Sequence, residues 1–582
     1  MTEKETRTGA LRTAGRLFWH YAELVIAVNL GMLLLGMAGN ALLPASTRAD
    51  VRLLIMVAEM AVVPALWMAV RRHRKQAIGE MVAIIFAPFL VLLVLFWLGL
   101  LGVAQVSMIG HWAMYILMAA AVFRRRDEYA ALPRFTVRGK WFKGAASVLI
   151  VLLIPGAVSA ASTIGRFGDI YEARADAVSV APAAKSHDPA KPTVAFLTGG
   201  NGTNAADLLG PYEVLARTGR FNLYVVSAGP RLIHMTGGLD LVPDMTFDEL
   251  DRLMSGQGDT LDAVIFPAMQ TPEPAELASI NAWARRQSAA GALTVSVCNG
   301  ARALARTGLL DGRPATSHWL RMRGLRADFP AVKWRSGMRY VDDGDVITAA
   351  GVLSGIDAAL RIVERLADAP AARQAADAVH WRHYSPGAPA SIPVRSLELA
   401  DLVAPLNSSY QTGPSDIGVL LTDGVGELEL ASVFNSYTEQ SVVGRTIAVA
   451  DGPVRSEHGL TFVPRATLAA AATGLDRLLV PGLDAARRQV PGVGDLRPEY
   501  LHTTGEFAFD AVLRDIARTY DVATARFAAK TLEYPVVDVK LTGPGWPWLP
   551  TLVFVLLLLL GVAAAWTITV AIRFLSRRRA HA

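Results

Sequence analysis

The chain has 582 residues, of which 52% are hydrophobic and only 19% are charged. Soluble proteins average about 25% charged residues, so part of this chain is expected to lie in lipid, and the abundance of large apolar residues excludes a disordered chain. The net charge is +6, and the only cysteine, Cys298, excludes an internal disulfide and any metal site with several cysteine ligands.

Six apolar segments are long enough to cross a bilayer, which takes about 20 helical residues. They lie at residues 17–43, at 53–70, in two spans between Glu80 and Arg124 with a turn near 105–111, between Lys143 and Arg166, and at 549–572. No small-residue cleavage pattern follows a short apolar stretch near the start. The first segment is therefore interpreted as a retained span rather than a signal peptide.

Basic residues are concentrated on one side of these spans. They occupy the N-terminal tail, the loop 71–75, the stretch 124–143 and residues 577–579, whereas the alternate loops near 44–51 and 105–111 hold almost none. The positive-inside rule predicts that both termini are cytoplasmic and that the stretch 166–544 lies outside the cytoplasm. We find no transport or redox spacing among the polar residues of the spans, so the helices are interpreted as an anchor or partner surface in the cell (inner) membrane.

The stretch between the fifth and sixth spans alternates short apolar runs with amphipathic helices. This alternation predicts an α/β fold with a parallel sheet and helices on its faces. Segments rich in Ala, Pro and small polar residues predict linkers. The predicted domains are the five-helix transmembrane region 1–165, a linker 166–190, an α/β domain 191–384, a second linker 385–415, a second α/β domain 416–535 and a C-terminal transmembrane helix 545–573.

The two α/β domains share three short sequence matches in the same order. Residues 238–243 match 459–464, residues 261–267 match 475–481, and residues 356–360 match 509–513. The offset falls from 214 for the second match to 153 for the third, so the second domain lacks about 61 residues, including a counterpart of Cys298. We interpret it as a truncated, non-catalytic second copy that packs against the first as an internal pseudo-dimer or recognises a partner.

Cys298 follows an apolar strand, 293–297, and precedes a helix that begins near Ala301. The N-terminus of a helix offers unpaired N–H groups and the positive end of the helix dipole, which favour an anion. This environment predicts a thiol pKa below its usual value of about 8.5, and hence a nucleophile. Gly300 would keep the turn open. From the spacing alone, a buried structural cysteine fits equally well.

The residues around Cys298 resemble a known family. The segments that carry the resemblance are Val297–Trp319, Asp207–Glu213 and Tyr340–Asp357. They are similar to the PfpI family of the class I glutamine amidotransferase-like superfamily, and most of all to the branch of AraC-regulator sensory domains and isonitrile hydratases. The resemblance covers 191–384 well and 416–535 weakly. It implies a flavodoxin-like fold, in a family that includes hydratases, deglycases, chaperone-like proteins and ligand sensors.

The resemblance also implies catalytic roles for three residues. Cys298 would be the nucleophile, and Asp207 the neighbouring acid. A carboxylate beside a thiolate is repulsive, so Asp207 would have a raised pKa and donate a hydrogen bond to the sulfur. His318, 20 residues after the cysteine, would relay a proton.

Further residues would line the pocket of such a site. The N–H groups of Asn299 and of the Gly199-Gly200 turn would bind an oxyanion, and Glu213 would be a second acid or a structural ion-pair partner. Asn299 stands where the related branch has a threonine whose hydroxyl acts in isonitrile hydration, so this reaction is put in doubt. In the second copy, Ser432 lies near the place of Glu213.

Other motifs do not indicate a bound cofactor, a metal site or direct binding of nucleic acid. The pattern Gly200-x-Gly202-x-x-Ala205 imitates a dinucleotide fingerprint, but no acid ends the next strand, so no cofactor is expected. His380 and His383 have no clustered acids nearby, so no metal is expected. A helix-turn-helix follows neither domain, so nucleic acid is not an expected direct partner. The expected partners are the lipid bilayer, a small-molecule ligand or substrate, and a second copy as a pseudo-dimer or homodimer.

Two functions fit these observations equally well. One is a membrane-anchored, extracytoplasmic cysteine hydrolase, hydratase or deglycase that acts on a small carbonyl, amide or nitrile-like compound. The other is a non-catalytic small-molecule or redox sensor that signals through the membrane helices or a partner, with a thiol that oxidises first to a sulfenic acid. A scaffold with a vestigial pocket is the third interpretation.

Overall fold

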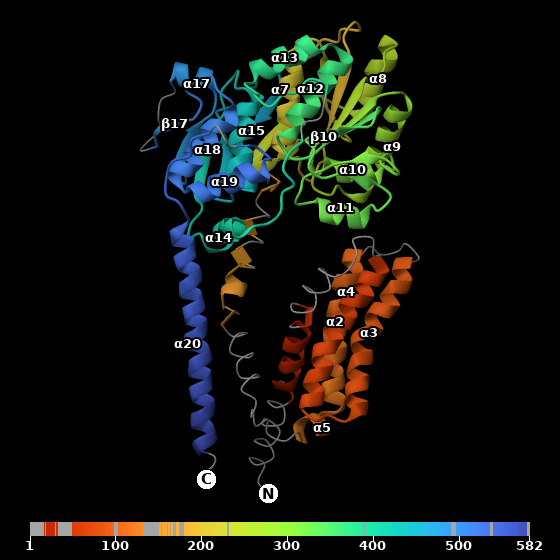
Figure 1. Cartoon of the computed structure of the whole chain (residues 1–582), viewed down its shortest axis with the longest axis vertical. Coiled ribbons are helices and arrows are strands. Elements are labelled where there is room, and N and C mark those ends of the chain that lie inside the picture. The colour runs from red at the N-terminus through yellow and green to blue at the C-terminus, as the bar shows by residue number, and fades with distance from the viewer. Residues whose placement is uncertain are drawn as a thin grey trace. The chain divides into compact units, whose positions relative to one another are not determined.

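The computed structural model (Figure 1) describes residues 17, 19–29, 31–32, 49–97, 103–131, 151–152, 154–159, 161–162, 165–166, 170–173, 180–229, 232–387, 391–489, 496–535 and 539–578. The chain divides into two compact units. The first comprises residues 1–143 with 326–330, and the second comprises residues 144–325 with 331–582.

The first unit is made of apolar helices. They are α2 (Ala49–Val70), α3 (Lys75–Trp97), α4 (Val103–Arg124) and the short α5 (Arg126–Ala131). α3 packs against both α2 and α4, and the buried contacts are formed by Met, Ile, Leu, Val and Phe side chains. Glu23 accepts hydrogen bonds from Arg71 (2.7 Å) and Trp67 (3.2 Å), so this polar group is paired between helices.

Three helices in the described part of the chain are long and apolar enough to cross a membrane, judged by length and composition. They are Leu53–Val70, Lys75–Leu95 and Trp548–Thr567, and Ile109–Arg124 is a shorter apolar helix. The predicted turn near 105–111 is wrong, because α4 begins at Val103 and continues as a helix through these residues. About half of the predicted spans 17–43 and 144–165 lies outside the described residues.

In the second unit, residues 192–384 form what we name the first lobe, an α/β fold around a seven-stranded sheet. The strand order is β10-β11-β7-β6-β1-β2-β5, and only β10 and β11 are antiparallel neighbours. Every residue of β1, β2, β6 and β7 is buried, as is typical of parallel strands covered on both faces. The predicted parallel α/β sheet is confirmed.

The elements of the first lobe follow the alternation expected from the sequence. The sheet strands are β1 (Thr193–Leu197), β2 (Asn222–Ser227), β5 (Met245–Thr246), β6 (Ala263–Phe266), β7 (Leu293–Ser296), β10 (Tyr340–Asp342) and β11 (Val346–Ala349). The helices are α7 (Ala205–Ala216), α8 (Phe247–Gln257), α9 (Pro274–Ala289), α10 (Gly300–Arg306), α11 (Met322–Asp328), α12 (Ser354–Leu366) and α13 (Ala369–Ala378). A small separate pair is formed by β8 (Pro314–Ala315) and β9 (Lys333–Trp334).

Residues 399–535 form what we name the second lobe, which is smaller. Its four parallel strands have the order β13-β12-β16-β17, the same as the order β2-β1-β6-β7 in the first lobe. The strands are β12 (Ser415–Leu420), β13 (Gly444–Val449), β16 (Arg477–Val480) and β17 (Pro498–Tyr500). The helices are η2 (Leu399–Leu402), α14 (Val403–Tyr410), α15 (Glu427–Asn435), η3 (Ser436–Gln440), α16 (Leu468–Ala471), α17 (Leu483–Arg488), α18 (Ala508–Thr519) and α19 (Val522–Thr531). The predicted linker 385–415 therefore contains helical structure near its end.

A shared antiparallel sheet joins the two lobes. Each lobe contributes a hairpin, β3 (Ile233–Met235) with β4 (Leu239–Val242), and β14 (Val454–Arg455) with β15 (Thr461–Val463). β4 pairs with β15, and Leu241 lies directly opposite Phe462. These two strands lie in the matching segments 238–243 and 459–464, and the opposed residues are themselves equivalent in that match. The two lobes are thus related by a local twofold axis at this pair.

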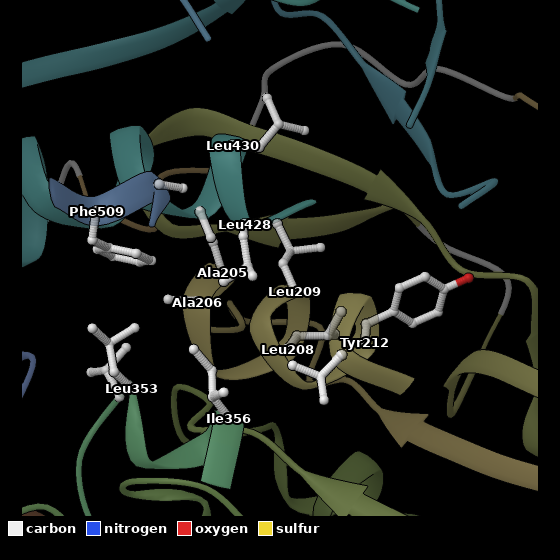
Figure 2. Packing of buried hydrophobic residues seen from close by; sticks show 14 of the residues in the cluster. Ala205, Ala206, Leu208, Leu209, Tyr212, Leu353, Ile356, Leu428, Leu430 and Phe509 are labelled. Carbon is white, nitrogen blue, oxygen red and sulfur yellow. The ribbon is translucent and has the colours of Figure 1, made fainter. Parts of the chain in front are cut away.

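The lobes also share one hydrophobic core. α7 packs against both α12 of its own lobe and α15 of the second lobe. Figure 2 shows Leu209 of α7 beside Leu428 of α15, with Ile356 of α12 and Phe509 of α18 in the same cluster. Burial of one leucine side chain stabilises a protein by about 1.5–3 kcal/mol. A core continuous across the lobes therefore favours a fixed arrangement of the two.

The residues that lead into the first lobe, 165–166 and 170–173, are named the stalk. Arg166 donates hydrogen bonds to the carbonyl oxygens of Asn407 (2.5 Å) and Gln411 (2.7 Å) in the second lobe. The carbonyl oxygen of Ile170 accepts the N–H of Gly237, in the turn between β3 and β4 (2.8 Å). The stalk therefore touches both lobes.

The C-terminal helix α20 (Trp548–Arg578) belongs to the same unit. It packs against α14, where the ring of Phe554 meets that of Tyr410. Gly561 lets α20 approach the residues before the stalk, because a Cβ atom there would collide with the carbonyl group of Val151. Residues near 151 and α20 thus lie side by side.

Candidate active site

Cys298 lies in a tight turn between β7 and α10. Its φ angle is +56°, a left-handed conformation that costs a non-glycine residue about 1–3 kcal/mol. Its N–H donates to the carbonyl oxygen of Ala349 in β11 (3.2 Å). Gly300 is needed for steric reasons, because a Cβ atom there would collide with the carbonyl oxygen of Phe266. The backbone therefore fixes the sulfur at the carboxyl end of the parallel strands, where α/β folds usually bind ligands.

Asp207, in the first turn of α7, interacts with the Cys298 thiol. Its Oδ2 accepts a hydrogen bond from the N–H of Ala268 (3.0 Å). Its Oδ1 is buried, and apart from the Cys298 thiol no group among the described residues bonds to it. Burial raises the pKa of Asp207 well above its usual range, and the contacts with Ala268 and Cys298 offset only part of this. The protonated form of Asp207 is therefore favoured.

The predicted low pKa of the Cys298 thiol is wrong for this closed structure. Burial, to 8% exposure, raises the pKa of Cys298 well above its usual value, and the carboxyls of Asp207 and Glu439 raise it further. The N–H of Asn299 and the charge of Arg321 act in the opposite direction but are weaker. Loss of hydration and two nearby acids thus outweigh the helix N-terminus on which the prediction depended.

Glu439 brings an acid from the second lobe into the site. It lies in η3, and its Oε2 accepts hydrogen bonds from the hydroxyl of Tyr171 (3.0 Å) and from Nδ2 of Asn204 (2.6 Å). Asn204 is the N-cap of α7, and its Oδ1 accepts the N–H of Asp207 (3.0 Å). Burial also raises the pKa of Glu439. The Cys298 site is therefore built from three parts of the chain, namely the first lobe, the second lobe and the stalk.

His318 is buried on another side of the site. Its Nε2 donates to the carbonyl oxygen of Thr531 at the end of α19 (2.7 Å). Burial lowers the pKa of His318 to about 4, so the ring is neutral. The described hydrogen bonds do not join His318 to Cys298, whose carbonyl oxygen instead accepts the hydroxyl of Ser317 (2.6 Å). A proton relay through His318 would therefore require the ring to leave Thr531.

The end of α19 covers this part of the first lobe. Glu533 accepts the N–H of Gly351 (2.5 Å), and the carbonyl oxygen of Leu532 accepts the N–H of Leu353 (3.3 Å). Burial raises the pKa of Glu533 to about 7. The second lobe thus closes over the loop that follows β11, next to Ala349 and the cysteine.

The predicted oxyanion-binding N–H groups already have partners. The N–H of Gly199 donates to Thr203 Oγ1 (3.1 Å), and that of Gly200 donates to Glu276 Oε1 (2.8 Å). The N–H of Asn299 is engaged with the Cys298 sulfur. An oxyanion role for any of these groups would require its present hydrogen bond to break.

Glu213 lies in the contact between the lobes. Its carboxylate accepts a hydrogen bond from Arg217 (2.8 Å) and from the N–H of Leu428 in α15 (2.7 Å). In the reverse direction, Asn435 Oδ1 of the second lobe accepts the N–H of Ala206 in α7 (3.1 Å). Burial raises the pKa of Glu213 to about 7, and the nearby Glu427 adds to this. The described contacts of Glu213 therefore match the structural alternative left open by the sequence.

The second lobe has a matching position that lacks a cysteine. β17 pairs with β16 as β7 pairs with β6, and two residues beyond the last pair Cys298 corresponds to His502. The paired strands β1–β2 and β12–β13, and the starts of α7 and α15, are all 222 residues apart. Asp207 therefore corresponds to Glu429. By the same offset Asn435, and not Ser432 as predicted, takes the place of Glu213.

A cavity of about 270 Å³ opens at this position in the second lobe. Its lining includes Glu429 and His502 of the second lobe together with Glu213, Arg217 and His380 of the first. The N–H of Gly482 donates to Nδ1 of His502 (3.1 Å), and burial lowers the pKa of His502. This counterpart position therefore borders a cavity and holds a neutral imidazole, itself only 3% exposed, where the first lobe has a thiol.

The chemistry available in the closed Cys298 site is limited by protonation. The thiolate is the reactive form of cysteine, and both the thiol and Asp207 are protonated here. Reaction thus requires an opening that hydrates the sulfur or moves one acid away. Within the described residues, no group of three or more His, Cys, Asp or Glu side chains could hold a metal ion.

Several residues of the site were missed by the sequence analysis. Asn204 could have been found, because Asn three residues before Asp207 is an N-cap pattern. Glu439 and Tyr171 lie 141 positions after and 127 positions before Cys298, and only the packing of lobes and stalk brings them to it. Ser317 adjoins the predicted His318, but its contact with a backbone carbonyl has no sequence pattern.

Comparison with known proteins gives a consistent result. The model of the DJ-1/PfpI family matches residues 192–365. An isonitrile hydratase of Pseudomonas putida is 31% identical over 163 residues, which are 28% of this chain and 66% of that protein, just under two thirds of its length. An uncharacterised protein from the cpoL 5′ region of Streptomyces lividans is 34% identical over 123 residues, which are 20% of this chain and 82% of that protein. A solved structure of a ThiJ/PfpI family protein from Pseudomonas syringae is 28% identical, with a TM-score of 0.29, and the match covers 34% of this chain and 77% of that one.

Proposed function

Because residues 192–365 belong to the DJ-1/PfpI family, we propose that this protein is a membrane-anchored sensor. In this proposal Cys298 reacts with a small electrophile or oxidant, and the change reaches the membrane helices through the stalk. The second lobe is a shortened second copy of the family domain, paired with the first inside one chain. The common strand order and the local twofold axis at Leu241 and Phe462 support this origin.

One observation favours a sensor above an enzyme. The stalk residue Tyr171 donates its hydroxyl to Glu439, whose charge acts on Cys298. A chemical change at the sulfur would therefore disturb a hydrogen bond made by the segment that enters the lobes beside the membrane-helix candidates. An enzyme that turns over substrate has no need of this connection, and it does need an open path to its nucleophile.

The reaction with a peroxide illustrates the proposed switch. The Cys298 sulfur, once deprotonated, attacks one peroxide oxygen. An S–O bond forms and the O–O bond breaks. The leaving hydroxide takes up a proton and departs as water, so the sulfur is oxidised to a sulfenic acid and the peroxide is reduced. The larger, polar sulfenic acid no longer fits between Asp207 and Glu439, and the buried network must rearrange.

We also propose six membrane spans, with both termini in the cytoplasm and the lobes outside it. The support is the four basic segments on one side of the apolar stretches. An extracytoplasmic location suits this function, because the compartments outside the cytoplasm are oxidising. The five N-terminal spans would act as the anchor and signal output, and α20 as a second attachment of the lobes.

A second candidate function is a cysteine-dependent hydratase, hydrolase or deglycase. The observation that favours it is the strained turn of Cys298, with φ of +56° and Asp207 beside the thiol, in a domain 31% identical to an isonitrile hydratase. Asn299 has no hydroxyl to act as an acid or base, so any such reaction would depend on Asp207 for proton transfer. The substrate class would be a small carbonyl, amide or nitrile-like compound.

The two functions separate in one experiment on the full-length protein in lipid nanodiscs. We expect hydrogen peroxide to raise hydrogen–deuterium exchange at residues 165–173 of the wild type and to leave the Cys298→Ser variant unchanged. We also expect isonitriles, amides and α-dicarbonyls to be consumed no faster than in buffer. Cys298-dependent consumption without any change at the stalk would contradict the sensor and support the enzyme.

A further inference from the structure

The carboxyl group of Glu439 is an unexpected member of the Cys298 site. The second lobe supplies it from η3, and it is fixed by hydrogen bonds from Asn204 (2.6 Å) and Tyr171 (3.0 Å). Thr236, whose hydroxyl lies 3.4 Å from that of Tyr171, extends the same network. Burial raises the pKa of Glu439, whereas the hydrogen bonds from Tyr171 and Asn204 and the charge of Arg321 lower it. No cation among the described residues forms a direct ion pair with the ionised Glu439.

We propose that Glu439 is a specificity-determining positioning residue. It makes the Cys298 site accept uncharged electrophiles and reject anionic ones, such as compounds that carry a carboxylate next to the reactive carbon. The inference rests on the proposed function only in assuming that Cys298 reacts with a small electrophile.

The charges that face Cys298 support this selectivity. Glu439 is the acid that supplies negative charge at the sulfur, because burial favours the uncharged, protonated form of Asp207, and Arg321 is the cation that opposes it. Arg321 is exposed, so water screens its charge, whereas both acids are buried. His318 is neutral and directed to Thr531. An anion that enters this site would therefore lose its hydration without gaining a buried positive partner.

The local twofold axis provides an internal comparison. The 222-residue offset that relates α7 to α15 makes Glu439 the counterpart of Arg217. Arg217 lines the cavity that His502 also lines, whereas Glu439 accepts a hydrogen bond from Asn204, the N-cap of the helix that holds Asp207. The two corresponding positions thus carry opposite charge, negative toward the Cys298 site and positive toward the cavity.

The test uses two alkylating reagents of nearly equal size that differ in charge, iodoacetamide and iodoacetate. Cys298 is the only cysteine of the chain, so all thiol alkylation reports this site. The ratio of the two rates is measured by intact mass on the full-length wild type, on Glu439→Gln, and on Glu439→Asp, which keeps the charge. The same protein unfolded in urea gives the intrinsic ratio. Glu457→Gln, an exposed second-lobe acid bound to Arg217, is the matched control.

We expect the folded wild type to prefer iodoacetamide roughly tenfold more than the unfolded chain does. Glu439→Gln should remove most of this preference, while Glu439→Asp and Glu457→Gln should retain it. Arg321→Gln, a surface change that leaves the fold intact, should strengthen the preference and so tests the proposal even if Glu439→Gln does not fold. A loss of packing alone would raise both rates and leave their ratio unchanged.

An unchanged ratio in both Glu439→Gln and Arg321→Gln would overturn the proposal. So would a folded wild type with the ratio of the unfolded chain, or a cysteine that neither reagent reaches in wild type or variant. These results are distinct from failure of the sensor function, which is judged by exchange at the stalk after peroxide. If alkylation of Cys298 is selective but peroxide leaves exchange at the stalk unchanged, the role of Glu439 is supported and the sensor function is contradicted.

Discussion

The two lobes share a strand order, a helix pair and a hairpin, yet they differ most where β7 and β17 end. In the first lobe this position is Cys298, sealed and protonated. In the second it is His502, beside a cavity of about 270 Å³. In both, a helix end of the other lobe lies over the position, α19 near Cys298 and the end of α13 near His502. Each position is thus covered by a corresponding helix end of the other lobe. The difference between the two sites therefore comes from the strands and helices of the lobe that contains each site.

The cavity at His502 lies where the described residues of the second lobe provide no counterpart of several elements of the first. In the first lobe, the corresponding stretch forms α10, β10 and β11, and Cys298 is anchored to Ala349 of β11. The second lobe passes from β17 to α18 with no strand beyond β17 in its sheet among the described residues. Without these elements the space at His502 is not filled. The tight turn that holds Cys298 therefore depends on the neighbouring strands as much as on its own residues.

The largest expected effect is a loss of stability on substitution of Gly300, the glycine that permits the tight turn of Cys298. Gly300→Ala should lower the stability of the protein by about 3 kcal/mol, because the new methyl group would collide with the Phe266 carbonyl oxygen in β6. Gly452→Ala, in an open turn of the second lobe, is the matched control and should change stability by less than about 1 kcal/mol. Thermal unfolding followed by circular dichroism measures both. Equal effects would show that the first lobe tolerates a larger residue at its elbow.

The next effect is a pH dependence of protein stability that comes from His318. His318 is neutral in the fold, with a pKa of about 4, whereas the unfolded chain binds a proton below about 6.5. Stability should therefore fall as pH drops from 6.5 toward 4, by roughly 2–3 kcal/mol from this residue. His318→Gln, which keeps a donor for the Thr531 carbonyl, should flatten this part of the profile in urea titrations. An unaltered slope would mean that His318 leaves Thr531 and takes up a proton within the folded state.

The comparison can be tested directly by moving the thiol. In a Cys298→Ala background, we expect His502→Cys to react with iodoacetamide within roughly tenfold of the rate of native Cys298. His502 lines a cavity of about 270 Å³, but its side chain is only 3% exposed, and Glu429 and Glu506 act on this position as acids act on Cys298. Rates are measured by mass spectrometry at pH 7. A reaction much faster than this would show that the cavity alone makes the position reactive.

A pH effect of similar size but opposite sign is expected at the lobe contact. The pKa of Glu213 is raised to about 7 from an ordinary value near 4.5, so its contribution to stability is present below pH 4.5 and is lost as pH rises through 7. Glu213→Gln should therefore remove roughly 2–3 kcal/mol of pH dependence across this range. Its counterpart Asn435 cannot titrate, and Asn435→Gln serves as the control. Identical pH profiles for the wild type and Glu213→Gln would mean that Glu213 stays ionised.

The sequence was sufficient for the α/β fold of the first lobe, and the family resemblance placed Asp207 close to Cys298, but the pairing of the two hairpins was not predicted. Buried strands and helix starts are local properties, and the matches at 238–243 and 459–464 lie within the strands that meet. The thiol pKa was predicted with the wrong sign, because the dipole of α10 is local whereas burial and the charge of Glu439 depend on the packing of both lobes. The contact of Tyr171 with Glu439 spans 268 positions and could not be read from spacing.

The pairing of β4 with β15 within one chain has an evolutionary consequence. In a dimer of identical subunits, every substitution appears on both sides of the symmetry axis. Here the two sides are separate stretches of one gene product, so each can change alone. Cys298 and His502, Asp207 and Glu429, and Arg217 and Glu439 occupy matching positions with different side chains. Because both lobes lie in one chain, the end of α19 covers Cys298 whatever the protein concentration, and this lid differs chemically from the lobe that it covers.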